Sequence, residues 1–517
     1  MLFAAAATIG ASQLLAQAPP AATPTLTANA RLVVLDVDAV DQTGKVPADL
    51  TAKDFQVFED GKPQRIRSVE PPSAHTLPML APSAAPSKDT VFDPAHPAAF
   101  GQSPVTILVL DQLNTHFADS SFARRSLRDY LAAQPAVLAQ PATLLSVYDE
   151  HFKLLQPFTR DRDALLRALA AEPVQYAWQL EINGKADHGP IERLDQSLRA
   201  LEEIAQNDAR IPGRKNLIWV GGGFPSMDPA ALEARDLQEV QSTLRHVTDV
   251  LLAARVTLFA VDPTSTAAAM TEVTDDSQMA FMEAAGDSDA GGDDPFGASD
   301  DFDRLGPVTG GRVIRARNDV AAQIAASVEL GANFYTIAYT PDTDSGASAK
   351  YRKIKVVCLR PGVTATTRTG YYGGQTPPRE SEANAAYDLT SAAESARPLN
   401  GLHVTVERDA SPQAPPETWI VHVSAPNLTW KPESGGAASA SVYVMAVSLD
   451  AKNKMLSHTL QGMTASARPG ANLIDETRTA EFVITAPAAP KAAMLRFVVR
   501  DNASGRIGSV DLPLPKR

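Results

Sequence analysis

Apolar and polar residues alternate with a period of two in some regions of this chain and follow helical spacing in others. The positions where the period changes indicate the boundaries between its domains. Over residues 28–70 the two kinds alternate with a period of two, which is typical of half-buried strands. Asp60 and Gly61 lie between two alternating segments, and this dipeptide favours a tight hairpin turn because both residue types tolerate positive φ. The pattern therefore predicts a small β module over residues 28–70.

From residue 103 onward, continuous apolar runs alternate with segments of helical spacing. Such runs are typical of strands that are buried on both faces of a parallel sheet. Strands that alternate with helices imply right-handed crossovers and a doubly wound parallel sheet, Rossmann-like, with helices on both faces. The predicted strands are residues 105–113, 142–150, 152–159, 216–225, 256–265 and 310–316, and the predicted helices are residues 120–133, 162–173, 192–206, 237–255 and 319–330.

An acidic insertion at residues 271–303 interrupts this series. It lacks both the DxDxDG order of a helix-loop-helix calcium site and a nine-residue repeat, so a solvated loop is the simpler interpretation. Beyond it, residues 333–341, 350–361 and 363–372 are predicted as strands that extend the α/β domain or edge its sheet. The domain is thus expected to span residues 103–373.

Residues 71–102 and 374–397 are rich in Pro, Ala, Ser and polar residues, which indicates linkers. From 398 to 517, short alternating strands return with turn residues between them, a pattern typical of an immunoglobulin-like β-sandwich. Gly505 is expected to turn the last hairpin. The predicted strands of this region are residues 402–408, 418–425, 441–450, 480–487 and 495–501.

The formal net charge of -13 argues against a nucleic-acid partner, because such binding needs Lys and Arg to neutralise phosphates. The single cysteine, Cys358, excludes an internal disulfide and a cysteine-based zinc site. Acid pairs such as Glu202-Glu203 are interpreted as solvated charge.

The first 18 residues are apolar, rich in Ala and end in Ala-Gln-Ala, which indicates a secretory signal, although no Lys or Arg precedes the apolar run. A disordered tail is the other interpretation of this stretch. A signal would place the protein outside the cell, in the periplasm or in the cell envelope. No later segment reaches the ~20 apolar residues that a transmembrane segment needs.

The candidate site lies where two predicted strands end. Asp111 ends the first strand of the α/β domain, and Gly221, Gly222 and Gly223 end the fourth. In a doubly wound sheet these strands are neighbours, and ligands bind at the carboxyl ends of strands near the point where strand order reverses. Asp111 is therefore either a metal ligand or a residue that caps a helix or a turn.

The residues around this site resemble a known family. Asp111 and the segment from Pro212 to Pro225 are similar to a von Willebrand factor type A domain. The segments FQVFEDGKPQRI, TGGRV, FYTIAYTP and YRKIKVVCLRPGVTATTRTGYY narrow the resemblance to the VWFA-related proteins of acidobacteria. The match runs from about Arg31 to Tyr372. It implies a type A fold and a role in binding proteins.

The resemblance also implies a metal-ion-dependent adhesion site of the pattern DxSxS, in which Mg²⁺ takes oxygen ligands from the protein and from a partner. Carried onto this chain, Asp111 holds the first position and Thr115 keeps a hydroxyl at the last. Leu113 replaces the first Ser, and Asn114 adds an amide beside it. Glycines stand where the family has a second Asp, so the pattern implies weak binding of Mg²⁺, Mn²⁺ or Ca²⁺, or none.

Asp262, which ends the fifth strand before Pro263, is a candidate for a compensating carboxylate, and the alternative is a turn or helix cap. The loops expected to contact a partner include Leu113, His116, Gly222, Gly223 and Phe224. The chain has no GxSxG elbow, HExxH pair or phosphate loop, so an enzyme is not expected.

These observations favour an exported, non-enzymatic factor for protein binding, adhesion or assembly, with or without a divalent cation. Three alternatives remain open: a metal-independent envelope scaffold, a polysaccharide-binding protein and a hydrolase that uses Asp111. The second would need exposed aromatic residues on the terminal sandwich, where Trp419 and Trp430 are equally able to fill a core.

Overall fold

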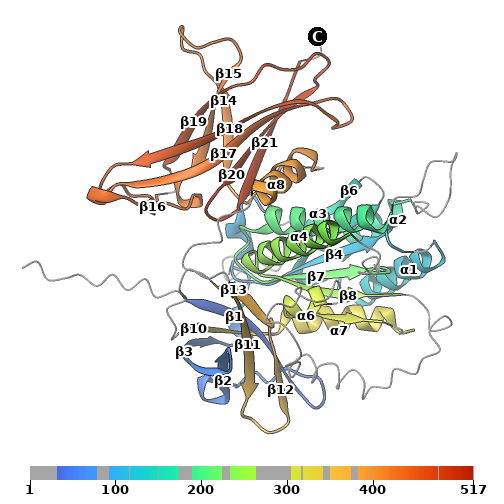
Figure 1. Cartoon of the computed structure of the whole chain (residues 1–517). Coiled ribbons are helices and arrows are strands. Elements are labelled where there is room, and N and C mark those ends of the chain that lie inside the picture. The colour runs from blue at the N-terminus through green and yellow to red at the C-terminus, as the bar shows by residue number, and fades with distance from the viewer. Residues whose placement is uncertain are drawn as a thin grey trace, which may run out of the picture.

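The computed structural model describes residues 32–78, 92–115, 117–148, 151–173, 189–223, 233–263, 304–315, 318–341, 350–373, 382–395, 397–475 and 477–515. These residues form three stacked parts, with a β-sandwich at one end, an α/β unit in the middle and a separate antiparallel sheet at the other end (Figure 1). Among them, no helix is both long and apolar enough to span a membrane.

The middle part is built on a six-stranded sheet in the order β6-β5-β4-β7-β8-β9. Five of the strands are parallel, and β6 runs antiparallel to β5 at the edge, which the sequence pattern did not predict. Strand order reverses at β4, since β5 lies on one side of it and β7 on the other. The strands are β4 (Val105–Asp111), β5 (Val137–Tyr148), β6 (His151–Asp161), β7 (Lys215–Val220), β8 (Val256–Val261) and β9 (Arg312–Ile314).

Helices cover both faces of this sheet, as the alternation of apolar runs and helical segments predicts. Apolar residues of α1 (Phe117–Ala133), α2 (Arg162–Ala171) and α7 (Val320–Ala332) share one core with alternate residues of the strands. Those of α3 (Pro190–Asp208), α4 (Ala234–Ala253) and the short α6 (Leu305–Val308) share a second core with the other strand residues. The arrangement is therefore mixed α/β and doubly wound.

The N-terminal strands do not form a separate module. They alternate with strands from much later in the chain in a seven-stranded sheet of order β12-β1-β10-β3-β2-β11-β13. The strands are β1 (Val33–Asp41), β2 (Phe55–Glu59), β3 (Lys62–Glu70), β10 (Tyr335–Thr340), β11 (Lys350–Cys358), β12 (Val363–Thr366) and β13 (Gly370–Gly373). The expectation that residues 333–372 edge the α/β sheet is wrong, because their apolar faces pack with β1 and β2 in a core of their own.

The predicted Asp60-Gly61 hairpin is confirmed. Both residues have positive φ, 48° and 75°, between β2 and β3. The 71–102 stretch is more than a linker, since Phe92 and Phe100 are buried in the core of the α/β unit.

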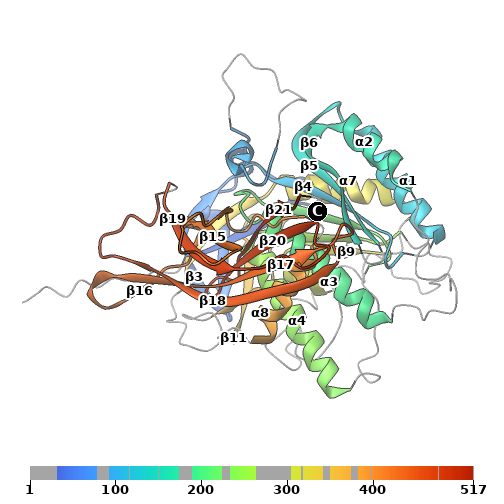
Figure 2. The same cartoon turned by 90° about the horizontal axis from the view of Figure 1, so that it is seen from above.

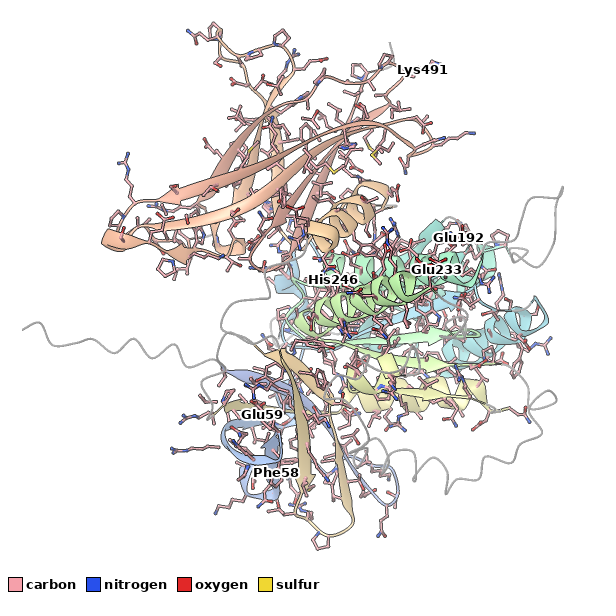
Figure 3. The ribbon with its side chains drawn as sticks, viewed as in Figure 1. Phe58, Glu59, Glu192, Glu233, His246 and Lys491 are labelled. Carbon is pink, nitrogen blue, oxygen red and sulfur yellow. The ribbon has the colours of Figure 1, made fainter. Side chains whose placement is uncertain are left out.

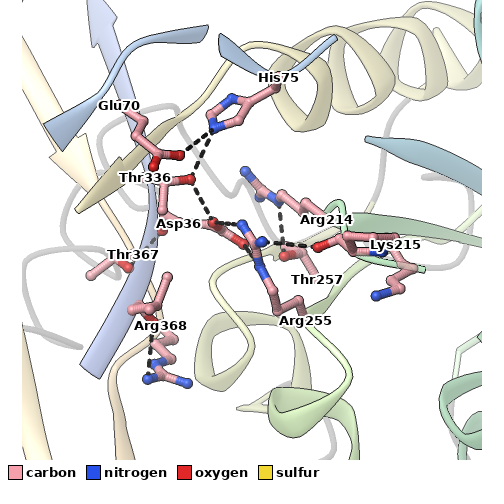
Figure 4. Close-up of polar contacts among 12 residues, drawn as sticks. Asp36, Glu70, His75, Arg214, Lys215, Arg255, Thr257, Thr336, Thr367 and Arg368 are labelled. Atoms are coloured by element: carbon pink, nitrogen blue, oxygen red, sulfur yellow. Dashed lines mark hydrogen bonds and ion pairs between the residues drawn. The ribbon is translucent and has the colours of Figure 1, made fainter. Parts of the chain in front are cut away.

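Two ion pairs join this sheet to the amino ends of the parallel strands, one buried and one half-buried, and Figure 4 shows the half-buried pair of Asp36 with Arg255. Asp38 on β1 accepts from the guanidinium of Arg214, with an Nη1–Oδ1 distance of 2.5 Å, and Asp36 pairs with Arg255 at the same distance. Arg214 and Arg255 directly precede β7 and β8. The pairs therefore lie at the end of the α/β sheet opposite to Asp111.

The C-terminal part consists of two antiparallel sheets that share one apolar core. One has the order β14-β15-β19, and the other contains β16, β17, β18, β20 and β21. Their bounds are β14 (Val404–Arg408), β15 (Thr418–Ser424), β16 (Lys431–Pro432), β17 (Ala438–Leu449), β18 (Met455–Ala467), β19 (Thr479–Thr485), β20 (Met494–Asp501) and β21 (Ile507–Pro513). Gly505 turns the last hairpin with φ 71°, as predicted.

A helix, α8 (Glu382–Glu394), occupies most of the stretch that was expected to be a linker. It lies between the sandwich and the α3–α4 layer in Figure 1, and the view from above shows it beside α4 (Figure 2). Leu389, Ala392 and Ala393 pack on β17 and β20. Arg496 of β20 caps the helix by donating to the carbonyl of Ser395 at 2.6 Å, which satisfies an oxygen at a helix end. The helix thus connects two parts of the molecule.

Candidate functional site

The Asp111 carboxylate at the end of β4 is completely buried and is occupied by hydrogen bonds within the protein. Its Oδ1 accepts from the backbone N–H groups of Leu113 and Asn114, both at 2.9 Å. Its Oδ2 accepts from the indole Nε1 of Trp219, on neighbouring β7, at 3.0 Å. This is the pattern of an Asp that closes a turn after a strand.

Burial raises the pKa of Asp111 to about 6, and the hydrogen bonds from Asn114, Trp219 and Leu113 only partly oppose this effect. The side chain is 0% exposed, so a ligand cannot reach it without opening the turn.

Of the other two candidate ligands of this turn, the Thr115 hydroxyl is engaged and the Asn114 amide is engaged through its nitrogen alone. The Oγ1 of Thr115 accepts from the backbone N–H of Gly222 at 2.8 Å. Asn114 donates from Nδ2 to the hydroxyl of Ser197 on α3 at 2.9 Å, and its buried Oδ1 has no hydrogen-bond partner. Leu113 is 1% exposed and belongs to the core, so the expectation that it contacts a partner is wrong.

The glycines that end β7 are required by close packing. A Cβ at Gly221 would lie 2.4 Å from the Cβ of Asp111 and 2.6 Å from the Oγ1 of Thr115. A Cβ at Gly222 would lie 2.6 Å from the carbonyl oxygen of Asn114. Gly223 has φ +79°, which favours glycine, and its own Cβ position is open toward Arg315. Glycine therefore brings the β7 end directly onto the Asp111 turn.

Asp262 does not join Asp111. Strand β7 lies between their strands, with Val220 opposite Leu110 on one side and Val261 on the other. Asp262 is 8% exposed and forms an ion pair with Arg315, with an Nε–Oδ2 distance of 3.6 Å. The predicted residues His116 and Phe224 lie outside the described residues.

A second group of polar side chains, which the sequence analysis missed, lies between helices of different parts. Glu202 of α3, His246 of α4 and Asp388 of α8 are buried, and one ligand atom from each lies within 4.8 Å of the others. His246 projects from α4 toward α8 (Figure 3), and its Nε2 lies 2.5 Å from the Oδ1 of Asp388. These three residues could hold a metal ion.

Glu202, His246 and Asp388, which we call the α3–α4–α8 cluster, share their charges with a buried arginine. Arg500 of β20, fully buried, donates from Nε to the Oδ2 of Asp388 at 2.6 Å. Burial raises the pKa of Asp388, but the hydrogen bond and charge of His246, a hydrogen bond from Glu202 and the charge of Arg500 outweigh burial and hold that pKa below its usual range. For Glu202, burial and the nearby Asp388 carboxylate raise the pKa well above the ordinary value.

The interpretation of Glu202-Glu203 as solvated charge is wrong, because these side chains are 1% and 6% exposed. The local signal was available, since Glu202 lies four positions after Leu198 and three before Ala205, which places it on the apolar face of α3. The partners of Glu202 could not be predicted. His246 and Asp388 follow it by 44 and 186 positions (246 − 202 and 388 − 202), and these separations match no known motif.

Comparisons with known proteins give only partial likenesses. No family model matches the chain, and no curated protein matches it. Among solved structures, the SpRpn10 VWA domain is 13% identical over 32% of this chain and 89% of its own, with a TM-score of 0.16. A calcium-binding mutant of Bacteroides uniformis β-glucuronidase 2 is 11% identical over 35% of this chain and 18% of its own, with a TM-score of 0.12.

An endonuclease/exonuclease/phosphatase from Beutenbergia cavernae is 13% identical over 36% of this chain and 38% of its own, with a TM-score of 0.10. At these TM-scores none of the three structures bears on what the chain does. What the chain can bind follows from its own residues.

Proposed function

We propose that this protein is a non-enzymatic binding or assembly factor that contacts a protein partner through the carboxyl end of its central sheet without an ion at Asp111. One observation carries the proposal. Both oxygens of Asp111 and the hydroxyl of Thr115 accept hydrogen bonds from the protein itself, so of the candidate ligand oxygens of this turn the Oδ1 of Asn114 alone is left, which is too few for a cation that takes six oxygen ligands. Binding at this end would rest on direct contacts.

The position of the surface supports a binding role. The carboxyl ends of parallel strands next to a strand-order reversal are where α/β sheets bind ligands. Gly222, Gly223 and the exposed Arg315 lie at this end among the described residues. The proposal keeps the expectations of a type A-like fold, an immunoglobulin-like sandwich and export to the envelope or beyond.

The structure offers less support to the other functions. A hydrolase that uses Asp111 would need that carboxylate to reach a substrate, yet it is completely buried. A polysaccharide-binding sandwich would need exposed aromatic rings. Trp419 and Trp430 pack against the sandwich core, and the exposed large hydrophobic side chains of the described residues include no aromatic.

The test is affinity capture with the immobilised full chain from envelope extracts, with Mg²⁺ or with EDTA. The variant Arg315→Glu reverses a charge at the carboxyl end, and Arg67→Glu, exposed on β3 of the other sheet, is its matched control. We expect a defined protein to be captured equally in Mg²⁺ and EDTA, lost with Arg315→Glu and kept with Arg67→Glu. Capture that needs Mg²⁺, or that only Arg67→Glu abolishes, would contradict the proposal.

A further inference from the structure

We propose that Glu202, His246 and Asp388 bind one divalent transition-metal ion of the Zn²⁺ class, and that this ion fastens α8 and the sandwich to the α/β unit. The inference does not depend on the proposed partner surface, which lies at the end of the central sheet. It rests on the burial of the Glu202 carboxyl group, on the geometry of the three side chains and on the nitrogen and oxygen ligand atoms that they offer.

Glu202 is the first reason to expect a cation. Its side chain is 1% exposed, and neither carboxylate oxygen has a hydrogen-bond partner of good geometry; its polar neighbours are the hydroxyl of Ser391 and the carboxylate of Asp388. A buried carboxyl group with so few donors is costly, and the second carboxylate lies in the same cluster. An ion between the two would satisfy Glu202 and would remove the repulsion.

The balance of formal charge around the cluster agrees. Four acids lie in or next to it, namely Glu202, Asp388, Asp195 and Glu394, the last two paired with Arg199. Two arginines, Arg199 and Arg500, oppose them. In the state that metal binding requires, with neutral His246 and both carboxylates ionised, the sum is −2 (2 − 4), which a divalent ion neutralises.

Two of the three ligands, His246 and Asp388, need little adjustment to bind one ion. Ligand atoms around a tetrahedral Zn²⁺, at bond lengths of about 2.0–2.2 Å, lie about 3.3 Å from one another. The Nε2 of His246 and the Oδ1 of Asp388 are 2.5 Å apart and would separate by less than about 1 Å. Arg500 holds the other oxygen of Asp388, which leaves Oδ1 for the ion and fixes the orientation of the carboxylate.

The ligand types select the class of ion. Imidazole with two carboxylates suits Zn²⁺ and its transition-metal neighbours, whereas Mg²⁺ and Ca²⁺ prefer oxygen ligands alone. Three protein ligands leave one position of a tetrahedral ion for water or for the second oxygen of Glu202.

The role follows from where the ligands come from. α3 and α4 belong to the α/β unit, whereas α8 packs on β17 and β20 of the sandwich. The same junction contains the hydrogen bond from the Nε2 of Gln206, on α3, to the carbonyl of Gly505 at 3.1 Å. An ion bound here therefore couples two parts that the chain connects only through α8.

The experiment uses the full chain, stripped with a chelator and dialysed against Zn²⁺, with metal content and thermal midpoint measured together. Glu202→Gln and His246→Gln each remove one ligand, and His458→Gln, exposed on β18, is the matched control. We expect one Zn²⁺ per chain, a higher midpoint with Zn²⁺, and an affinity at least about tenfold weaker in both ligand variants only. Bound Co²⁺ should show visible d–d bands that Glu202→Gln abolishes.

A proton shared between Glu202 and Asp388 is the competing explanation. In that case wild type would bind no Zn²⁺ and Glu202→Gln would be as stable as wild type, because an amide replaces a neutral acid. That result would overturn the inference, as would Zn²⁺ binding that survives in both ligand variants. Neither outcome would affect capture at the carboxyl end of the central sheet.

Discussion

Asp111→Asn distinguishes a buried turn carboxylate from a metal ligand. Asn keeps the shape and can still accept from the N–H groups of Leu113 and Asn114, but it does not ionise. The pKa of Asp111 is raised by burial from 3.8 to about 6. At about 1.4 kcal/mol for each pH unit, the ionised carboxylate costs the folded state about 3 kcal/mol.

The sign follows from the direction of the shift. Between pH 3.8 and about 6 the folded state holds the Asp111 proton more tightly than the unfolded chain does. The stability contribution of this residue is therefore full below pH 3.8 and is lost as the pH rises to about 6. The free energy of unfolding of wild type, minus that of Asp111→Asn, should fall by about 3 kcal/mol over this range and be constant above it.

Two measurements check this prediction. Urea unfolding of both proteins from pH 4 to pH 8 gives the difference in free energy. ¹⁹F NMR of fluorotryptophan-labelled protein, with the Trp219 signal assigned through Trp219→Phe, reports the Asp111 proton directly because the indole donates to this carboxylate. The chemical shift of the Trp219 signal should change with a midpoint near pH 6 and should not change when millimolar Mg²⁺ is added. A signal that is flat from pH 4 to 8, or that Mg²⁺ moves in wild type alone, would refute the reasoning.

Three further substitutions test the packing described above by chemical unfolding or hydrogen exchange. Gly221→Ala should lower the free energy of unfolding by about 1–3 kcal/mol because its Cβ meets Asp111 and Thr115. Gly189→Ala has open space around its Cβ and should change this free energy little; equal effects of the two substitutions would contradict the packing argument. Arg214→Met should lower the free energy of unfolding by about 3–5 kcal/mol because it leaves Asp38 buried and unpaired. As a control, Arg315→Met removes one partner of a half-exposed pair and should change this free energy by less than about 1 kcal/mol. Arg496→Lys should speed amide exchange in α8 by weakening its cap, since Lys cannot pair with Asp511 through two N–H groups; unchanged exchange would show that apolar contacts alone hold the helix.

Much of the α/β unit could be predicted from local pattern. The continuous apolar run of β4 indicates a buried strand, and the helical spacing of apolar residues in α3 indicates a helix with one buried face. Each signal lies within one segment, so the kind of element and its position could both be predicted. Strand β18 was missed because one of its faces is exposed throughout and the other is at most half-buried, and because Leu456 and Leu460 stand on the exposed face, so apolar and polar residues do not alternate along it. α8 was missed because Ala and polar residues dominate it, and its burial comes from distant strands.

The candidate site shows the same division. The sequence placed Asp111 and the glycines of β7 side by side, which is correct because adjacent parallel strands end together. It did not reveal that Trp219 would donate to Asp111, since that contact depends on which face of β7 the indole occupies. The pairing of β1 with β10 was equally hidden, because an alternating strand does not specify its partner.

The seven-stranded sheet also dictates an order of events during synthesis. Glu70 at the end of β3 pairs beside Thr336 of β10, which is 266 positions later (336 − 70). At about 5–20 residues per second, a ribosome needs roughly 13 to 50 seconds to supply that partner. Among the described strands, β1 pairs with β10 and β12 alone, so it has no strand partner during this interval, while the α/β unit between can already fold. The first strand to be made is thus paired only after Tyr335 and the rest of β10 have left the ribosome, whereas β2 and β3 can pair with each other at once.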